Sequence, residues 1–341
     1  MAFISEMHEL YLQCHTEQFA GNTVAIKKRA IRYFLGMVGD MDIHELSYRH
    51  AEEYKIRLLD PAYCDRAGRK KPGKASANDY MTNLWAFFAW LVKRGDLRRN
   101  PFFGLPRYKE EKKPVKVFTA KEVELLLKRS GERYRLPVIC GAIFGLRLGE
   151  ALNLTKHDID LKDLTVEVRS KSGSRRTWPW STKTSYQRLV PIPAIVVFPD
   201  FRVPVSQWLR SRIATCKHPY LCLSDRQYYS MLKMQNTGMN ANGRTLAKHE
   251  LQIEANRPWR GFGHGWIELW YRVGLPQRDY KSFKTLRATF GTILSRQMPI
   301  DDVQVLMGHS TPKTTRTFYI AREEQQIRDR AREELENYYV S

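Results

Sequence analysis

A short charged segment divides this chain of 341 residues into two parts of different character. Residues 108–115 read Tyr-Lys-Glu-Glu-Lys-Lys-Pro-Val, so the segment carries many charges and a proline but few apolar side chains. This composition is typical of a linker between domains, because it offers a hydrophobic core almost nothing. We therefore expect one domain at residues 1–108, a linker at residues 109–116 and a second domain at residues 117–341.

The first part of the chain has the residue spacing of helices. Apolar residues recur three or four positions apart within residues 31–38 and again within residues 81–91, where the pattern stops near Gly95. Residues 66–74 interrupt these helices with a basic, Gly- and Pro-containing loop that cannot be regular structure. The loop is either a solvated connection or a contact for the phosphates of a nucleic acid. Its candidate contacts are Arg66, Arg69, Lys70, Lys71 and Lys74.

The composition narrows the class of partner. A formal net charge of +21 usually indicates a polyanionic partner, most commonly a nucleic acid; a merely basic protein is the alternative. The five cysteines form no Cys-x-x-Cys pair, which argues against a zinc module and a disulfide framework and favours a reducing cytosol. No apolar run is long enough to span a bilayer, and the first residues do not resemble a signal peptide. We therefore expect a cytoplasmic, DNA-associated protein with no membrane partner.

The second part of the chain combines helical stretches with two short alternating ones. An apolar run is interrupted at Gly145, after which Arg147 and Glu150 open another helical stretch. Taken alone, this Arg and Glu could form an ordinary surface ion pair at i,i+3 spacing, worth only about 0.2–0.5 kcal/mol. Apolar and polar residues then alternate at 165–169 and again from Arg188, and both stretches predict strands.

Three side chains suited to phosphoryl transfer follow one another near the C-terminal end. Arg287 offers a planar fork of donors for the oxygens of a phosphate. His309, in a Gly-His step, offers a further donor or a proton carrier near neutral pH. Tyr319 offers a hydroxyl that can attack phosphorus and hold a covalent intermediate, whereas the preceding Phe318 has no hydroxyl.

Together these stretches resemble the tyrosine recombinase (phage integrase) family. The likeness rests on Gly-Leu-Arg147-Leu-Gly-Glu150, on Lys284-Thr-Leu-Arg287, and on Gly-His309 followed by Tyr319. It implies a mainly α fold with a small antiparallel β-sheet. A helical core-binding domain, which residues 76–102 resemble, and a catalytic domain with a C-terminal helix would form a two-domain, C-shaped clamp on DNA.

The resemblance implies site-specific cutting and rejoining of double-stranded DNA at specific core sites by a homotetramer. In that chemistry Arg147 and Arg287 grip the oxygens of the phosphate, with Glu150 in support, and Tyr319 forms a 3′-phosphotyrosine intermediate. His309 donates to a phosphate oxygen or handles the proton of the tyrosine. Because the ester stores the energy of the cut bond, ATP is not expected. Because two basic side chains grip the phosphate, a metal is not expected either. The chain accordingly has no Walker-type loop and no metal-ligand spacing of histidines.

Three positions leave alternatives open. The family places a catalytic lysine in a hairpin just before an Arg-x-Val-Pro strand, which favours Lys183 as general acid over its rival Lys171 on the preceding loop. Lys284 stands where the family usually has His, and we expect it to supply a fixed positive charge to the phosphate. His264, in the poorly assigned interval 197–275, either compensates for that missing His or is a structural or surface residue, which we favour.

Two other functions compete with recombination. A type IB topoisomerase-like enzyme would share the chemistry but relax supercoils as a monomer, without a need for two specific sites. A DNA-binding protein that kept the fold but lost catalysis would form no covalent adduct. Lys284 in place of the usual His is consistent with this alternative. The charged residues after Tyr319 predict a terminal helix, which is either solvated or, as often in the family, docked on a neighbouring protomer. The sequence indicates neither the target site nor the direction of the reaction.

Overall fold

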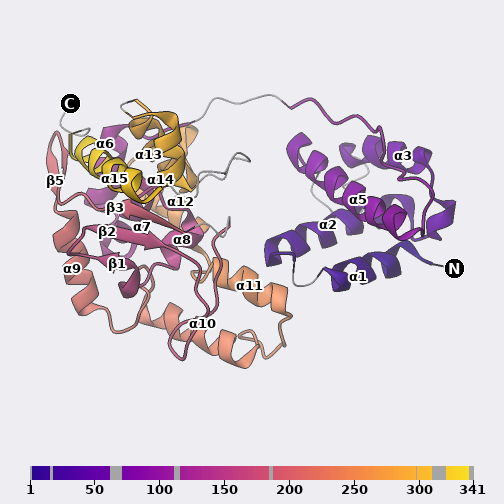
Figure 1. Ribbon diagram of the computed structural model, residues 1–341, viewed down its shortest axis with the longest axis horizontal. Helices are drawn as coiled ribbons and strands as arrows, with labels where there is room; N and C mark the ends of the chain where they lie inside the picture. The colour runs from indigo at the N-terminus through magenta and orange to yellow at the C-terminus, as the bar shows by residue number, and fades with distance from the viewer. Residues whose placement is uncertain are drawn as a thin grey trace. The chain divides into compact units, whose positions relative to one another are not determined.

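The computed structural model describes residues 2–15, 18–61, 71–110, 116–183, 187–296, 298–308 and 320–337. The chain forms two compact units, each with its own hydrophobic core (Figure 1). The first unit is Met1–Lys113 with Lys248–Glu250, and the second is Pro114–Ala247 with Leu251–Ser341. The predicted site residues that lie outside the described residues are Arg66, Arg69, Lys70, His309 and Tyr319.

The first unit is helical. Its helices are α1 (Ile4–Cys14), α2 (Gly21–Val38), η1 (Ile43–Glu45), α3 (Tyr48–Leu58) and α5 (Lys74–Arg94). The two longest, α2 and α5, pack against each other, and α1 and α3 contact both. Three buried aromatic rings, those of Phe34, Phe88 and Phe102, contact one another in the core. The end of α5 is confirmed near Gly95, which takes a left-handed φ of +85° that glycine adopts without strain.

The second unit is mainly helical, with two small antiparallel sheets among the residues that the structure describes. Its helices are α6 (Ala120–Arg129), α7 (Gly131–Ala142), α8 (Leu148–Leu152), η2 (Lys156–Asp158), α9 (Val205–Thr215), α10 (Asp225–Thr237), α11 (Lys248–Asn256), α12 (Phe262–Arg272), η3 (Gln277–Asp279), α13 (Lys284–Leu294), α14 (Ile300–Met307) and α15 (Ile320–Asn337). The first three residues of α11, Lys248–Glu250, are counted with the first unit. Its strands are β1 (Ile159–Asp160), β2 (Thr165–Val168), β3 (Arg188–Pro191), β4 (Val196–Phe198) and β5 (Phe201–Val203). The predicted fold class, mainly α with a small antiparallel β-sheet, is confirmed. Within the described ranges, no helix has both the length and the apolar character needed to cross a membrane.

The larger sheet has the strand order β1-β2-β3, and β2 and β3 are the strands predicted from alternation. They pair antiparallel with Val166 opposite Val190, and both valines are fully buried. β3 ends at Pro191, because proline has no amide hydrogen with which to bond within a ladder. Arg188 lies two residues before Val190 and is therefore on the same buried face of the strand.

Two glycines allow α13 to pack closely against α7 and the turn that follows it. A Cβ atom at Gly141 would lie only 2.9 Å from a leucine side chain of α13, and one at Gly145 only 2.3 Å from the ring of Phe290. Gly145 also has a φ of +59°, which strains any residue with a side chain. These two glycines thus bring the turn that precedes Arg147 against the helix that carries Arg287.

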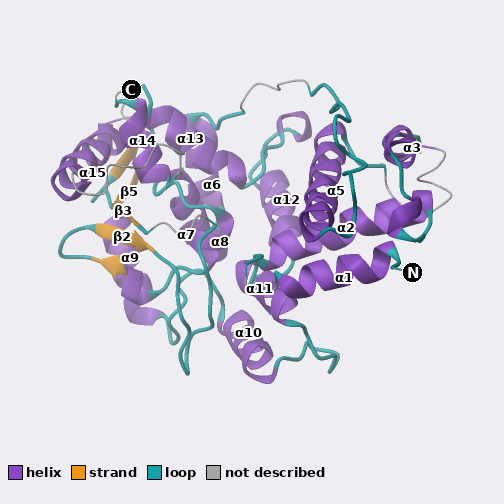
Figure 2. Ribbon diagram, turned by 45° about the vertical axis from the view of Figure 1, so that its right-hand side comes forward, coloured by secondary structure: helices purple, strands orange, loops and turns teal. Residues whose placement is uncertain are grey.

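The terminal helix α15 packs within its own unit. It contacts β3, β4 and α13, and Figure 2 shows it beside the strands. Ala331 and Leu335 of α15 are fully buried in a cluster with Phe290 and Leu294 of α13. The alternative that the terminal helix is solvated is therefore wrong. Docking on a neighbouring protomer stays a prediction, since in this single chain α15 covers its own unit.

Candidate functional site

Three arginine side chains converge on one buried carboxylate in the second unit. Glu150 accepts two hydrogen bonds from Arg188, at 2.6 and 3.2 Å, and one from the Arg147 guanidinium at 2.8 Å. The Arg287 guanidinium lies 3.7 Å from the same carboxylate. The members come from the start of α8, from β3 and from α13, so segments far apart in the sequence build one site. We call Arg147, Glu150, Arg188 and Arg287 the arginine cluster.

Local structure explains how α8 presents two of these residues. Arg147 is the N-cap of α8, and the Glu150 carboxylate accepts the Arg147 backbone N–H at 2.9 Å. This bond satisfies a backbone donor at the start of a helix, as the acidic residue of a capping box does. Only 3% of the Glu150 side chain is exposed. The interpretation of this pair as an ordinary surface ion pair is therefore wrong.

The same arginines also bind the end of α14. Three successive carbonyl oxygens each accept a bond from one of them: Leu306 from Arg188 Nε at 2.9 Å, Met307 from Arg287, and Gly308 from Arg147 at 3.5 Å. The last carbonyls of a helix have no helical donor and carry partial negative charge, so cations stabilise them. His309 follows directly in the sequence, and the cluster therefore holds the chain immediately before it.

The cluster carries an excess of positive charge. Three guanidinium groups and one carboxylate leave a net charge of +2 (3 − 1). Burial alone would raise the pKa of Glu150, but hydrogen bonds from Arg188 and Arg147 lower it overall. Burial, with the charges of Arg147 and Arg188, lowers the pKa of Arg287 to about 9, which leaves it cationic at neutral pH. The most accessible member is Arg147, whose side chain is 25% exposed, so the unbalanced charge can meet an anion from solvent.

The predicted lysines have different surroundings. Lys284 is exposed at the first position of α13, one turn before Arg287, so the two side chains share a face of that helix. Lys183 is exposed on the connection between β2 and β3. Its rival Lys171 is 11% exposed, and its ammonium group lies 2.9 Å from the buried carboxylate of Asp158. Because Lys171 is held in a structural ion pair, the geometry favours Lys183 for chemistry.

Arg188 was not among the predicted site residues. The signal that could have found it was a charged side chain on the buried face of an alternating strand, where it requires a partner. His264 is exposed on α12, and no hydrogen bond or ion pair joins it to the described cluster. Among the residues with described positions, no group of three or more His, Cys, Asp or Glu side chains could hold a metal ion.

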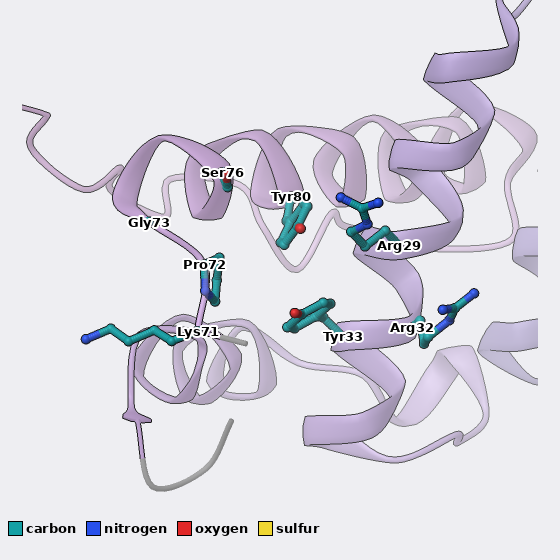
Figure 3. Close-up of a pocket in the computed structure, with 8 residues that line it drawn as sticks. All are labelled: Arg29, Arg32, Tyr33, Lys71, Pro72, Gly73, Ser76 and Tyr80. Atoms are coloured by element: carbon teal, nitrogen blue, oxygen red, sulfur yellow. The ribbon is translucent and has the colours of Figure 1, made fainter. Parts of the chain in front are cut away.

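The first unit contains a basic pocket of about 440 Å³ (Figure 3). Arg29 and Arg32 reach it from α2, and Lys71 lies on the segment that leads into α5. The rings of Tyr33 and Tyr80, with centroids 5.2 Å apart, lie between these basic residues. Since the pocket is lined by three cations and two phenols, it is suited to an anion with several acceptor oxygens.

The pocket includes one residue of the predicted basic loop. Lys71, one of the predicted contacts, lines it, and Lys74 is exposed at the first position of α5. Arg29 and Arg32 were not predicted, because the apolar stripe of α2 indicates only the buried face of that helix. Their signal was a pair of basic residues three positions apart on the opposite face of that helix.

Comparisons with known proteins agree on one family. Residues 116–326 match the model of the Phage integrase family. The putative defective protein IntQ of Escherichia coli K12 is 26% identical over 200 residues, which are 56% of this chain and 50% of that protein. Tyrosine recombinase XerC of Chromobacterium violaceum is 30% identical over 143 residues, which are 40% of this chain and 42% of that protein. The chain thus spans about half the length of the curated relatives it matches.

A solved structure shares the fold. The Tn1549 transposon integrase, in complex with a circular intermediate DNA, superposes with a TM-score of 0.60 at 18% sequence identity. The superposition covers 90% of this chain and 91% of that one. The likeness therefore extends over both units of the chain, beyond the residues that match the family model.

Proposed function

This chain belongs to the phage integrase family, and from that premise we propose that it cuts and rejoins double-stranded DNA at specific core sites through a 3′-phosphotyrosine intermediate. The observation that carries the proposal is the arginine cluster, with its net charge of +2 in the part of the chain that matches the family. A phosphodiester is an anion, and its transition state spreads charge over the phosphoryl oxygens. Fixed guanidinium groups would therefore stabilise the transition state.

The residues of the proposed site share the binding of the phosphate, the attack on it and the transfer of protons. Arg147 and Arg287 donate charge-assisted hydrogen bonds to the non-bridging oxygens, and His309 donates a further one. The Tyr319 hydroxyl attacks phosphorus while the bond from phosphorus to the 5′ oxygen breaks. Lys183 gives its proton to that oxygen as general acid, and the tyrosine proton passes to solvent or to His309.

The second half of the reaction reverses the first. A 5′ hydroxyl, from the same duplex or from a second one, attacks the phosphotyrosine and the tyrosine leaves. Because each step exchanges one phosphoester bond for another, the scheme requires no ATP. Because Arg147 and Arg287 supply the positive charge at the phosphate oxygens, it requires no metal either. Complete exchange between two duplexes cuts four strands, and each chain supplies one Tyr319. This stoichiometry supports a homotetramer on DNA.

The basic pocket of the first unit would hold the DNA backbone outside the reacting centre. Arg29, Arg32 and Lys71 are the described cations that line it. Contacts of this kind position DNA without reading its sequence. The remaining predicted contacts, Lys74 and the loop residues Arg66, Arg69 and Lys70, belong to the same proposal.

Replacing both Arg29 and Arg32 with alanine should weaken DNA binding and flatten its salt dependence. Each phosphate contact contributes about 0.9 to the slope of log affinity against log salt, so the slope should fall by about 1.8. Fluorescence anisotropy at several salt concentrations measures this slope. Arg94→Ala is the control, because Arg94 pairs with Asp96 at the other end of α5, roughly 27 Å along the helix from Ser76. An unchanged slope in the double variant would remove the pocket from the DNA interface.

Covalent trapping tests the proposed function. We would incubate the protein with nicked duplexes that carry its native flanking DNA, because the nick lets the short 5′ product diffuse away and leaves the intermediate in place. On a denaturing gel, wild type should give a protein–DNA adduct that is absent from Tyr319→Phe. The double variant Phe318→Tyr/Tyr319→Phe moves the hydroxyl by one residue and should also give none.

The alternatives predict different gels. An adduct that survives in Tyr319→Phe would assign the nucleophile to another residue. Tight binding by wild type without any adduct would favour a DNA-binding protein that lost catalysis. An adduct together with relaxation of supercoiled DNA lacking paired core sites would favour the topoisomerase-like alternative.

A further inference from the structure

Arg188 belongs to the arginine cluster but cannot meet the substrate. Only 1% of its side chain is exposed, against 25% for Arg147. A phosphate that approaches from solvent would therefore reach Arg147 first and Arg188 not at all. The task of Arg188 has to be sought in the groups that it contacts inside the protein.

The first contact is with Glu150. Arg188 donates to both carboxylate oxygens, at 2.6 and 3.2 Å, which is the two-pronged geometry that fixes a carboxylate in position and in rotation. The same carboxylate receives the backbone N–H and the guanidinium of Arg147. The orientation of the Arg147 side chain is thus set by a carboxylate whose own orientation is set by Arg188.

The second contact is with the end of α14. Arg188 Nε donates to the carbonyl of Leu306 at 2.9 Å. Its side chain also packs on Gly308, where a Cβ atom would lie 3.0 Å from a terminal nitrogen and 3.1 Å from Cδ of Arg188. Gly308 has a φ of +58° and ends the helix. One buried side chain therefore supports the turn from which the chain proceeds to His309.

We propose that Arg188 is a positioning residue of the DNA-cleavage site, which aligns Arg147 through Glu150 and fixes the Leu306–Gly308 turn. This inference rests on the proposed function. The role uses the whole guanidinium, because three donors of one planar group serve two acceptor groups in different directions. A lysine would keep the charge but would present a single nitrogen, so it could not hold both sides at once.

The variant Arg188→Lys tests the proposal, because it keeps the buried charge next to Glu150 and removes the fork. Two quantities are compared with wild type: the affinity for a core-site duplex, and the rate of adduct formation when all the DNA is bound. We expect the affinity to stay within about 2-fold and the rate to fall by 10- to 100-fold, in line with the cost of misplacing a catalytic group by about 1 Å.

A matched control separates positioning from stability. Arg212 also donates to two backbone carbonyls, those of Leu221 and Leu223, at 2.8 and 3.0 Å, within the same unit but away from the cluster. Arg212→Lys should lower the melting temperature, because it also loses a guanidinium that binds two carbonyls, but leave the rate on bound DNA unchanged. Both rates are measured at a temperature where each variant is fully folded.

The outcomes are distinguishable from a failure of the proposed function. If wild type forms no adduct, the proposed function fails and the comparison of rates cannot be made. If wild type forms the adduct and Arg188→Lys matches its rate, the positioning role is refuted. A loss confined to affinity, or an equal loss of rate in Arg212→Lys, would refute it as well.

Discussion

Replacing Glu150 with alanine should lower the free energy of unfolding of the second unit by about 3–5 kcal/mol, the cost of leaving a buried charge without its partner. The Glu150 and Arg188 side chains are 3% and 1% exposed, so solvent cannot replace the lost carboxylate. The variant would also leave three guanidinium groups with no anion between them. Urea unfolding followed by tryptophan fluorescence measures the change, because six of the eight tryptophans lie in the second unit.

Glu124→Ala is the matched control for this prediction. Glu124, on α6 of the same unit, has a side chain that is only 7% exposed, but its partner Lys128 is 34% exposed. Once Glu124 is removed, Lys128 can turn to solvent, so the loss should be about 1 kcal/mol or less. Equal losses in the two variants would contradict the view that the crowded, buried arginines make Glu150 essential for stability.

Lowering the pH should reduce the difference in free energy of unfolding between wild type and Glu150→Ala. The pKa of Glu150 is lower in the folded protein than in the unfolded chain, where it is about 4.3. Its stabilisation is therefore fully present above that value and is lost as the pH falls through the lower pKa of the folded state. A difference between the two proteins that stays constant down to the lowest pH at which both fold would contradict this assignment.

Lys183→Ala should slow DNA cleavage by about 10²–10⁴-fold, the usual contribution of a general acid. Its melting temperature should stay close to that of wild type, because the side chain is exposed. Lys171→Ala should show the opposite behaviour, since the buried carboxylate of Asp158 loses a partner at 2.9 Å. Cleavage rates per folded molecule and thermal melts of both variants check this reversal.

A sulfur atom in place of the bridging 5′ oxygen identifies the role of each lysine. A thiol has a pKa of about 8.5 and leaves as a thiolate without a proton, so the modified DNA should restore the rate of Lys183→Ala. The modified DNA should not restore the rate of Lys284→Ala, because we expect Lys284 to supply charge to the phosphate. Lys284→His should retain activity on unmodified DNA. Rescue of Lys284→Ala but not of Lys183→Ala would exchange the two assignments.

The sequence contains the local reasons for much of this fold. Alternation predicted β2 and β3 because their side chains lie on the two faces of a sheet, and Gly95 marked the end of α5 because its left-handed φ suits glycine. That Arg147 and Arg287 lie in one site could be expected only through the family resemblance. Its physical cause, the contact of Gly145 with Phe290, joins residues 145 positions apart and leaves no periodic trace.

Other features could not be predicted because their partners are distant in the sequence. The alternation around Arg188 predicts only a strand, because its acceptors lie 38 positions before it and 118 positions after it. The packing of α15 depends on Ala331 and Leu335, which were too few to indicate a buried helix until α13 and β3 supplied the opposite surface. His309 and Tyr319 lie outside the described residues, so their parts in the site stay predictions.

The carbonyl oxygens at the end of α14 accept hydrogen bonds from the same arginines that are proposed to bind phosphate. Neutral backbone oxygens keep mutually repelling guanidinium groups converged before any DNA arrives, which lowers the cost of preorganising them. A phosphate is a stronger acceptor and would take donors of Arg147 and Arg287 from Gly308 and Met307. Arg188 is buried away from DNA and would keep its hydrogen bond to the Leu306 carbonyl. DNA binding would therefore replace two of the three bonds at the end of α14 and leave the bond from Arg188 in place.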